Sequence, residues 1–124
     1  MTSPLALLVY ENLMPGSQLV NRLQDLGYRV QSLPDARKLA ETAEREKALI
    51  IIADLQTRNA SVCEAITQLK AQAATAHIPV IAFVDVKQTE LHEAAQAAGA
   101  TLVASPATIL QHLPQFLDQA LQLD

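Results

Sequence analysis

Short apolar segments alternate along the chain with longer segments in which apolar residues recur every three or four positions. Several of the short segments are rich in β-branched residues, as strands are. The central ones are apolar throughout, which is typical of parallel strands buried on both faces. The predicted strands are Leu5–Tyr10, Arg29–Leu33, Ala48–Ala53, Pro79–Val84 and Thr101–Ala104.

The segments between these strands carry a helical pattern. In the first, apolar residues within Leu19–Leu26 fall on one face, and Gly27 follows as a typical C-terminal stop. The other predicted helices are a segment opened by Asp35 ("DARKLAETAERE"), Ser61–Ala73, Thr89–Ala98 before Gly99, and Ile109–Leu123.

Two of the predicted helices contain residues that bear on where they begin. The segment "TELHEAAQAA" from Thr89 resembles a capping box, in which a Thr hydroxyl and an acidic side chain satisfy the first amide groups. Pro114 lies inside the last helical pattern, where it either delays the start of that helix or kinks it.

Five strand–helix units in 124 residues predict one α/β domain spanning residues 1–124. The expected architecture is a flavodoxin-like (βα)5 fold, a doubly wound parallel sheet of five strands in the order 2-1-3-4-5. The chain contains no low-complexity segment and no internal repeat that would indicate a further domain.

Composition narrows the possible functions. Half of the residues are hydrophobic and 18% are charged, which is typical of a folded domain. The net charge is −4 and the basic residues are scattered, so a nucleic-acid-binding surface is not expected. Cys63 is the single cysteine, so no internal disulfide forms. No apolar run reaches the roughly 18 residues of a membrane span, and we expect a cytoplasmic chain.

The predicted sheet brings acidic residues together. In this strand order a crevice opens at the carboxyl ends of the first and third strands. Glu11 follows the first strand, Asp54 ends the third in "ALIIIADLQ", and Asp85 follows the fourth. We expect these carboxylates to share one crevice; the alternative for Asp54 is that it only caps the loop before the third helix.

Four motifs follow one another at the spacing of a known family. They are "DLGYRV" after the first helix, "ALIIIADLQ" at the third strand, "TAHIPVIAFV" at the fourth, and "EAAQAAGATLVASP" at the fourth helix and fifth strand. In this order they resemble the receiver domains of response regulators, the CheY-like family, over nearly the whole chain.

The resemblance implies a function in two-component phosphorelay signalling and no enzyme activity in the ordinary sense. In this family an aspartate, here Asp54, accepts a phosphoryl group from a phosphohistidine. An acidic cluster holds Mg²⁺, a lysine in the fifth strand pairs with the phosphoryl group, and a Thr or Ser after the fourth strand hydrogen-bonds it. A nearby aromatic side chain then repacks.

The sequence departs from that pattern at the supporting positions. Val84 stands at the switch hydroxyl, and Ser105 stands at the lysine, before Pro106. The acidic pair is reduced to Glu11, aligned as either Tyr10–Glu11 or Glu11–Asn12. We therefore interpret the chain as a degenerate receiver, or pseudo-receiver, that has lost its phosphorylation switch.

The sequence offers other oxygen ligands for Mg²⁺ and another cation in place of the residues that the family pattern expects. Glu11, Asp54 and the Gln56 carbonyl are oxygen ligands that would bind Mg²⁺ weakly. Arg58 supplies a substitute cation if its loop folds inward. Family resemblance also predicts a cis peptide bond before Pro106.

Three functional hypotheses remain open. The first is a phosphorylation-independent module that binds a histidine kinase, an output domain or another signalling protein, or forms a homodimer through the face of the fourth helix, fifth strand and fifth helix. The second is a conventional single-domain response regulator phosphorylated on Asp54. The third is a flavodoxin-like small-ligand sensor.

The remaining candidate residues are expected to be structural. Cys63 lies within a helical pattern without a basic neighbour, so a reactive thiol is not expected. His77, His92 and His112 lie in separate predicted elements and show no metal-ligand spacing.

Overall fold

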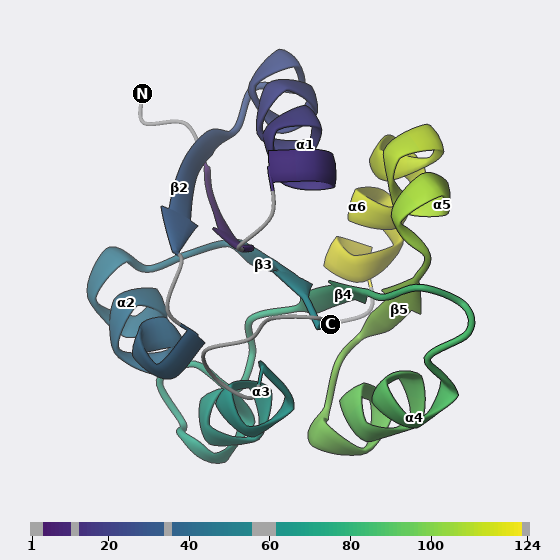
Figure 1. Cartoon of the computed structure of the whole chain (residues 1–124). Helices are drawn as coiled ribbons and strands as arrows, with labels where there is room; N and C mark the ends of the chain where they lie inside the picture. The colour runs from purple at the N-terminus through teal and green to yellow at the C-terminus, as the bar shows by residue number, and fades with distance from the viewer. Residues whose placement is uncertain (1–3, 11–12, 34–35, 56–61, 123–124) are drawn as a thin grey trace.

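The computed structural model contains a parallel five-stranded sheet with helices on both faces (Figure 1). It describes residues 4–10, 13–33, 36–55 and 62–122. The strand order is β2-β1-β3-β4-β5, which confirms the predicted flavodoxin-like topology. The strands are β1 (Leu5–Val9), β2 (Arg29–Leu33), β3 (Ile50–Asp54), β4 (Val80–Phe83) and β5 (Leu102–Ala104).

The helices form two layers. In Figure 1, α1, α5 and α6 cover one face of the sheet, and α2, α3 and α4 cover the other. The bounds are α1 (Leu13–Asp25), the 3-10 turn η1 (Ala36–Lys38), α2 (Leu39–Glu46), α3 (Val62–Ala71), α4 (Thr89–Ala98), α5 (Pro106–Gln111) and α6 (Leu113–Gln122). In the described part of the chain, no helix is long and apolar enough to cross a bilayer.

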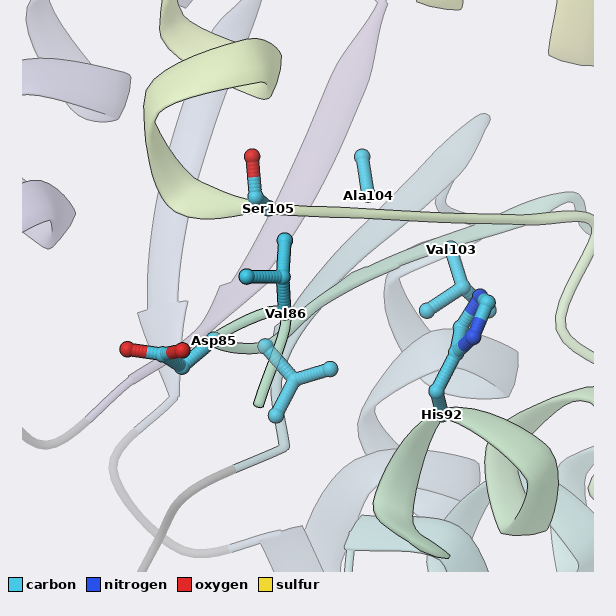
Figure 2. A pocket seen from close by; sticks show the side chains of 7 residues that line it. Asp85, Val86, His92, Val103, Ala104 and Ser105 are labelled. Atoms are coloured by element: carbon cyan, nitrogen blue, oxygen red, sulfur yellow. The ribbon is translucent and has the colours of Figure 1, made fainter. Parts of the chain in front are cut away.

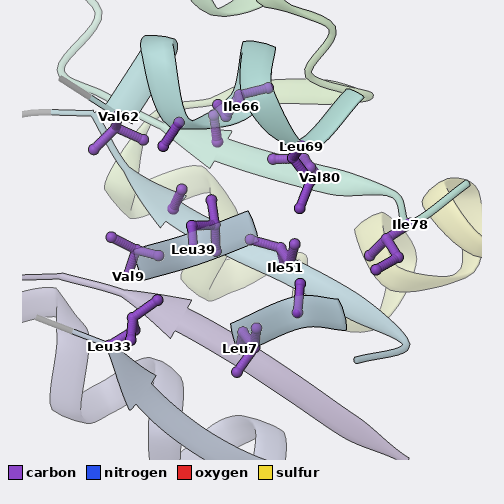
Figure 3. Close-up of a cluster of buried hydrophobic side chains, with 14 of the residues drawn as sticks. Leu7, Val9, Leu33, Leu39, Ile51, Val62, Ile66, Leu69, Ile78 and Val80 are labelled. Carbon is purple, nitrogen blue, oxygen red and sulfur yellow. The ribbon is translucent and has the colours of Figure 1, made fainter. Parts of the chain in front are cut away.

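The core is divided by the sheet into two clusters. Every residue of β1, β3 and β4 is buried, as their uniformly apolar sequences predict. Successive strand residues point to opposite faces, so Leu7 and Ile51 pack toward α2 and α3 while Leu8 and Ile52 pack toward α1 and α6. We call these the α2–α4 cluster, drawn in Figure 3, and the α1/α5/α6 cluster.

Hydrogen-bonded pairing shifts the strand ends from their predicted positions. Asp54 pairs with Phe83 and is the last residue of β3, as predicted, one residue beyond the apolar run Ala48–Ala53. Tyr10 and Val84 lie just beyond β1 and β4, although both were predicted to be strand residues. Apolar character alone does not locate these ends, because a side chain also packs against the core after the ladder has stopped.

The prediction of one C-terminal helix over Ile109–Leu123 was wrong. The structure has two helices, α5 and α6, with His112 between them. Pro114 explains the break: it has no amide hydrogen to donate four residues back, and its ring crowds the carbonyl there. The backbone restarts in α6, where the Phe116 amide donates to the His112 carbonyl at 3.0 Å.

The helix ends were predicted better than the helix starts. Gly27 and Gly99 both follow helices with positive φ, at 92° and 113°, as expected for helix stops. The capping box at Thr89 was wrong, because Gln88 is the N-cap and makes no side-chain capping bond. Asp35 lies outside the described residues, and the helical segment after it begins as η1.

Lys47 ends α2 in a left-handed conformation, with φ 54° and ψ 55°. A Cβ atom makes this conformation costly, whereas glycine adopts it freely. We expect Lys47→Gly to raise the free energy of unfolding by about 1 kcal/mol in urea titrations. Glu44→Gly, exposed inside the same helix, should lower it by about 1 kcal/mol. A Lys47→Gly variant less stable than the wild type would contradict this account of the cap.

Candidate functional site

The candidate site lies where three neighbouring strands end. Asp54 pairs with Phe83, and Phe83 pairs with Ala104, so the ends of β3, β4 and β5 form one edge. The ladder runs one residue further, since the Leu55 amide donates to the Phe83 carbonyl at 3.1 Å and the Val84 amide to the Ala104 carbonyl at 2.9 Å. This edge carries three of the positions predicted from the sequence, Asp54, Val84 and Ser105.

Asp54 is buried, with 5% of its surface exposed. Charged side chains are rarely buried to this degree without polar contacts or a functional reason. Glu11, the predicted neighbour of Asp54, lies outside the described residues, as do Gln56 and Arg58. The shared acidic crevice therefore stays a prediction on the Glu11 side.

Asp85 is exposed at the start of the loop between β4 and α4. Its Oδ1 accepts a hydrogen bond from the Lys87 backbone amide at 2.9 Å, which fixes the turn of the loop. In Figure 2 the carboxylate points away from His92 and Val103. Asp85 thus contributes to the rim of the site, and its best-defined role is to shape the loop.

Magnesium requires several oxygen ligands in near-octahedral geometry. Among the residues that the structure describes, no three His, Cys, Asp or Glu side chains gather closely enough to hold a metal ion. Two of the three predicted ligands, Glu11 and Gln56, lie outside that part. The described donors alone do not fit Mg²⁺.

Val84 offers no polar group to the site. Its side chain is 3% exposed and belongs to the α2–α4 cluster. An isopropyl group in this place neither donates nor accepts a hydrogen bond. A phosphoryl group on Asp54 would therefore find no switch hydroxyl at the end of β4.

Ser105 is occupied as the N-cap of α5. Its Oγ accepts from the Thr108 backbone amide at 3.2 Å and donates to Thr108 Oγ1 at 2.7 Å. Figure 2 shows the hydroxyl directed toward α5, away from Asp85. Sequence reasoning placed Ser105 at this edge but missed its capping role, although Ser followed by Pro at the first helical position is a typical helix start.

A pocket of about 230 Å³ lies beside this edge, between the β4–α4 loop, α4 and β5 (Figure 2). Its lining is about equally polar and apolar, and Val86 is 74% exposed at its mouth. Sequence reasoning missed the pocket because its parts come from three separate segments. The residues that line it are Val84, Asp85, Val86, His92, Val103, Ala104 and Ser105.

The other candidate residues have structural roles or lie apart. Tyr10 packs against the α1/α5/α6 cluster. Burial raises the pKa of the Cys63 thiol, which keeps it protonated and unreactive at neutral pH. His77 lines a separate pocket of about 480 Å³ near the amino ends of β3 and β4. His112 lies between α5 and α6.

Comparison of the fold with solved structures finds close matches. The receiver domain of sensor histidine kinase PA1611 from Pseudomonas aeruginosa, with magnesium in its active-site cleft, matches with a TM-score of 0.86 and 22% identity over 97% of this chain and 98% of that one. Chemotaxis protein CheY4 of Vibrio cholerae matches with a TM-score of 0.77 and 22% identity over 92% and 98%.

A third solved structure, also a receiver domain, matches over a similar share of the chain. The receiver domain of a modulated diguanylate cyclase from Desulfovibrio desulfuricans has a TM-score of 0.81 and 17% identity over 96% of this chain and 94% of that one. By sequence, the chain matches no protein-family profile and no curated protein. The chain thus has the receiver fold over nearly its whole length, at low sequence identity.

Proposed function

We propose that this chain is a receiver-type domain of two-component signalling that works by protein–protein interaction without a phosphorylation switch. The observation that carries the proposal is the position of Ser105. Where a receiver needs a cation, this chain has a hydroxyl that caps α5. The retained fold and Asp54 support a receiver origin, and the valine at position 84 supports the loss of the switch.

A phosphoryl group on Asp54 would add negative charge to the site. A phosphorylated aspartate beside other carboxylates needs cationic partners, and a charge-assisted hydrogen bond is worth about 1.5–3 kcal/mol. The chain has no lysine at position 105 to supply this stabilisation. Val84 has no hydroxyl that would convert phosphorylation into a movement of the β4–α4 loop.

Phosphorylation of Asp54 is the competing function, and the place of this carboxylate at the carboxyl end of β3 is the observation in its favour. In that case Arg58, outside the described residues, would supply the cation. Incubation with acetyl phosphate and Mg²⁺ followed by intact-mass measurement separates the two functions. We expect no stable mass increase, because the product lacks its cationic partner. Labelling that is lost in Asp54→Asn would reject the proposal.

The interaction surface that we propose is the face of α4, β5 and α5, defined by α4 (Thr89–Ala98) and residues 102–111. On α4, Ala94 and Ala97 are exposed while Ala95 is buried. Small side chains allow another backbone to approach closely. A histidine kinase, an output domain, another signalling protein or a second copy of the chain would contact this face.

Ala94→Arg tests this surface, because a long cation there holds another backbone away. We expect association with a partner or a second copy to weaken at least tenfold, about 1.4 kcal/mol, in light scattering or pull-down. Ala71→Arg, an exposed position at the end of α3, is the matched control and should leave association unchanged. Equal association of both variants would reject the surface.

A further inference from the structure

We infer that the pocket between the β4–α4 loop, α4 and β5 is the anchor site for a cationic partner segment, which inserts one large apolar side chain. This inference rests on the proposed function and names the chemistry of the partner on the proposed face. It is carried by the distribution of charge along the chain and by an unfilled pocket with three valines in its lining, Val84, Val86 and Val103.

The net negative charge of the chain comes from its last third. All nine Lys and Arg residues precede Gln88, and nine of the thirteen Asp and Glu residues do as well, so residues 1–87 are neutral overall. The remaining acids are Glu90, Glu93, Asp118 and Asp124, which together equal the net charge of −4. Glu90 and Glu93 are exposed on α4, the helix that supplies His92 to the pocket.

This distribution selects between the possible occupants. Two copies meeting through the same face would bring Glu90 and Glu93 of each copy together, with no Lys or Arg within α4, β5 or α5 to offset them, and like charges across an interface are unfavourable. A partner segment rich in Lys or Arg would be attracted to the face and steered toward it. Lys87, in the β4–α4 loop, is the nearest cation along the sequence. The occupant that fits is therefore a heterologous cationic segment.

The pocket supplies the apolar part of the recognition. Its volume of about 230 Å³ is below the roughly 300–1,000 Å³ typical of pockets for whole small-molecule ligands. It is suited to a single inserted side chain from a longer segment, which is how interface hot spots are built. Val86, 74% exposed at the mouth, would be covered by such a segment.

The chain has no Phe, Tyr or Trp side chain of its own at this pocket. Its four aromatic residues are Tyr10, Tyr28, Phe83 and Phe116, and all belong to or pack against the α1/α5/α6 cluster. Val84 and Val103, which line the pocket, pack with the α2–α4 cluster on the other face of the sheet. The pocket is therefore open to a side chain from another molecule.

The test uses random-peptide display against the immobilised full chain, followed by fluorescence anisotropy of the enriched peptides. We expect enriched peptides to carry net positive charge and one Leu, Ile, Met or Phe. Val86→Ser should weaken their binding at least tenfold by removing an apolar wall. Leu26→Ser, which removes an exposed apolar side chain at the far end of the sheet, should change it less than twofold.

A second pair of variants tests the charge. Glu90→Gln with Glu93→Gln should weaken binding about tenfold at low salt, and the difference should shrink at high salt because screening shortens the reach of exposed charges. Glu41→Gln with Glu44→Gln removes two exposed acids at the same spacing on α2 and should have little effect.

Several results would overturn the inference. They are failure to enrich any peptide, or enrichment of acidic or neutral peptides. Equal loss of peptide binding in a test variant and its control would also overturn it, as would self-association that Val86→Ser abolishes. None of these results would reject the proposed function, which a different measurement tests, Asp54-dependent labelling by acetyl phosphate.

Discussion

In a Ser105→Lys variant we expect labelling of Asp54 by acetyl phosphate and Mg²⁺ to rise about 10- to 100-fold over the wild type. The ends of β3 and β5 are separated by β4 alone, and adjacent strands lie about 4.8 Å apart. A lysine at the end of β5 therefore reaches toward a phosphoryl group on Asp54. A charge-assisted contact of about 1.5–3 kcal/mol corresponds to roughly that increase, at 1.4 kcal/mol for each factor of ten.

The matched control is Ser105→Gln. It gives a long side chain without the charge and removes the same cap from α5, at a cost of about 1 kcal/mol in stability. Labelling should stay at the wild-type level in this variant and be absent from Asp54→Asn/Ser105→Lys. Equal labelling of the Lys and Gln variants would show that the missing cation is not what limits phosphorylation of this chain.

For Phe83→Ala we expect the free energy of unfolding to fall by about 3–5 kcal/mol. Phe83 is 1% exposed and belongs to the α1/α5/α6 cluster. It lies in β4, which is hydrogen-bonded to β3 on one side and to β5 on the other. These strands cannot easily close around the cavity that the substitution leaves. Domains of this size are stable by about 5–15 kcal/mol, so the variant should be close to unfolding.

Urea titration followed by circular dichroism measures this loss. Phe116→Ala is the control, because Phe116 on α6 only packs against the same cluster and is partly exposed. We expect its loss to be clearly smaller. Similar losses for both variants would contradict this prediction, because a cavity at the centre of the sheet would then cost no more stability than one near the surface.

The architecture was predictable from the sequence because buried parallel strands have a distinctive pattern. "ALIIIAD" and "PVIAFV" are apolar on both faces, and each is followed by a helix with an apolar side. The C-terminal helices were less predictable, since periodicity continues through Pro114 while the backbone does not. Hydrogen bonding, which periodicity does not report, decided that break.

The sequence by itself determined the alternation of strands and helices, the place of Asp54 at the end of β3, and the chemistry available at positions 84 and 105, because these depend on residue type and chain order. Only the tertiary structure decided that Ser105 faces α5 and that His92, Val86 and Val103 line one pocket. The physical reason is that hydroxyl orientation and pockets depend on contacts between segments distant in the chain. Local patterns along a sequence record burial and propensity, and they do not record which distant side chains meet.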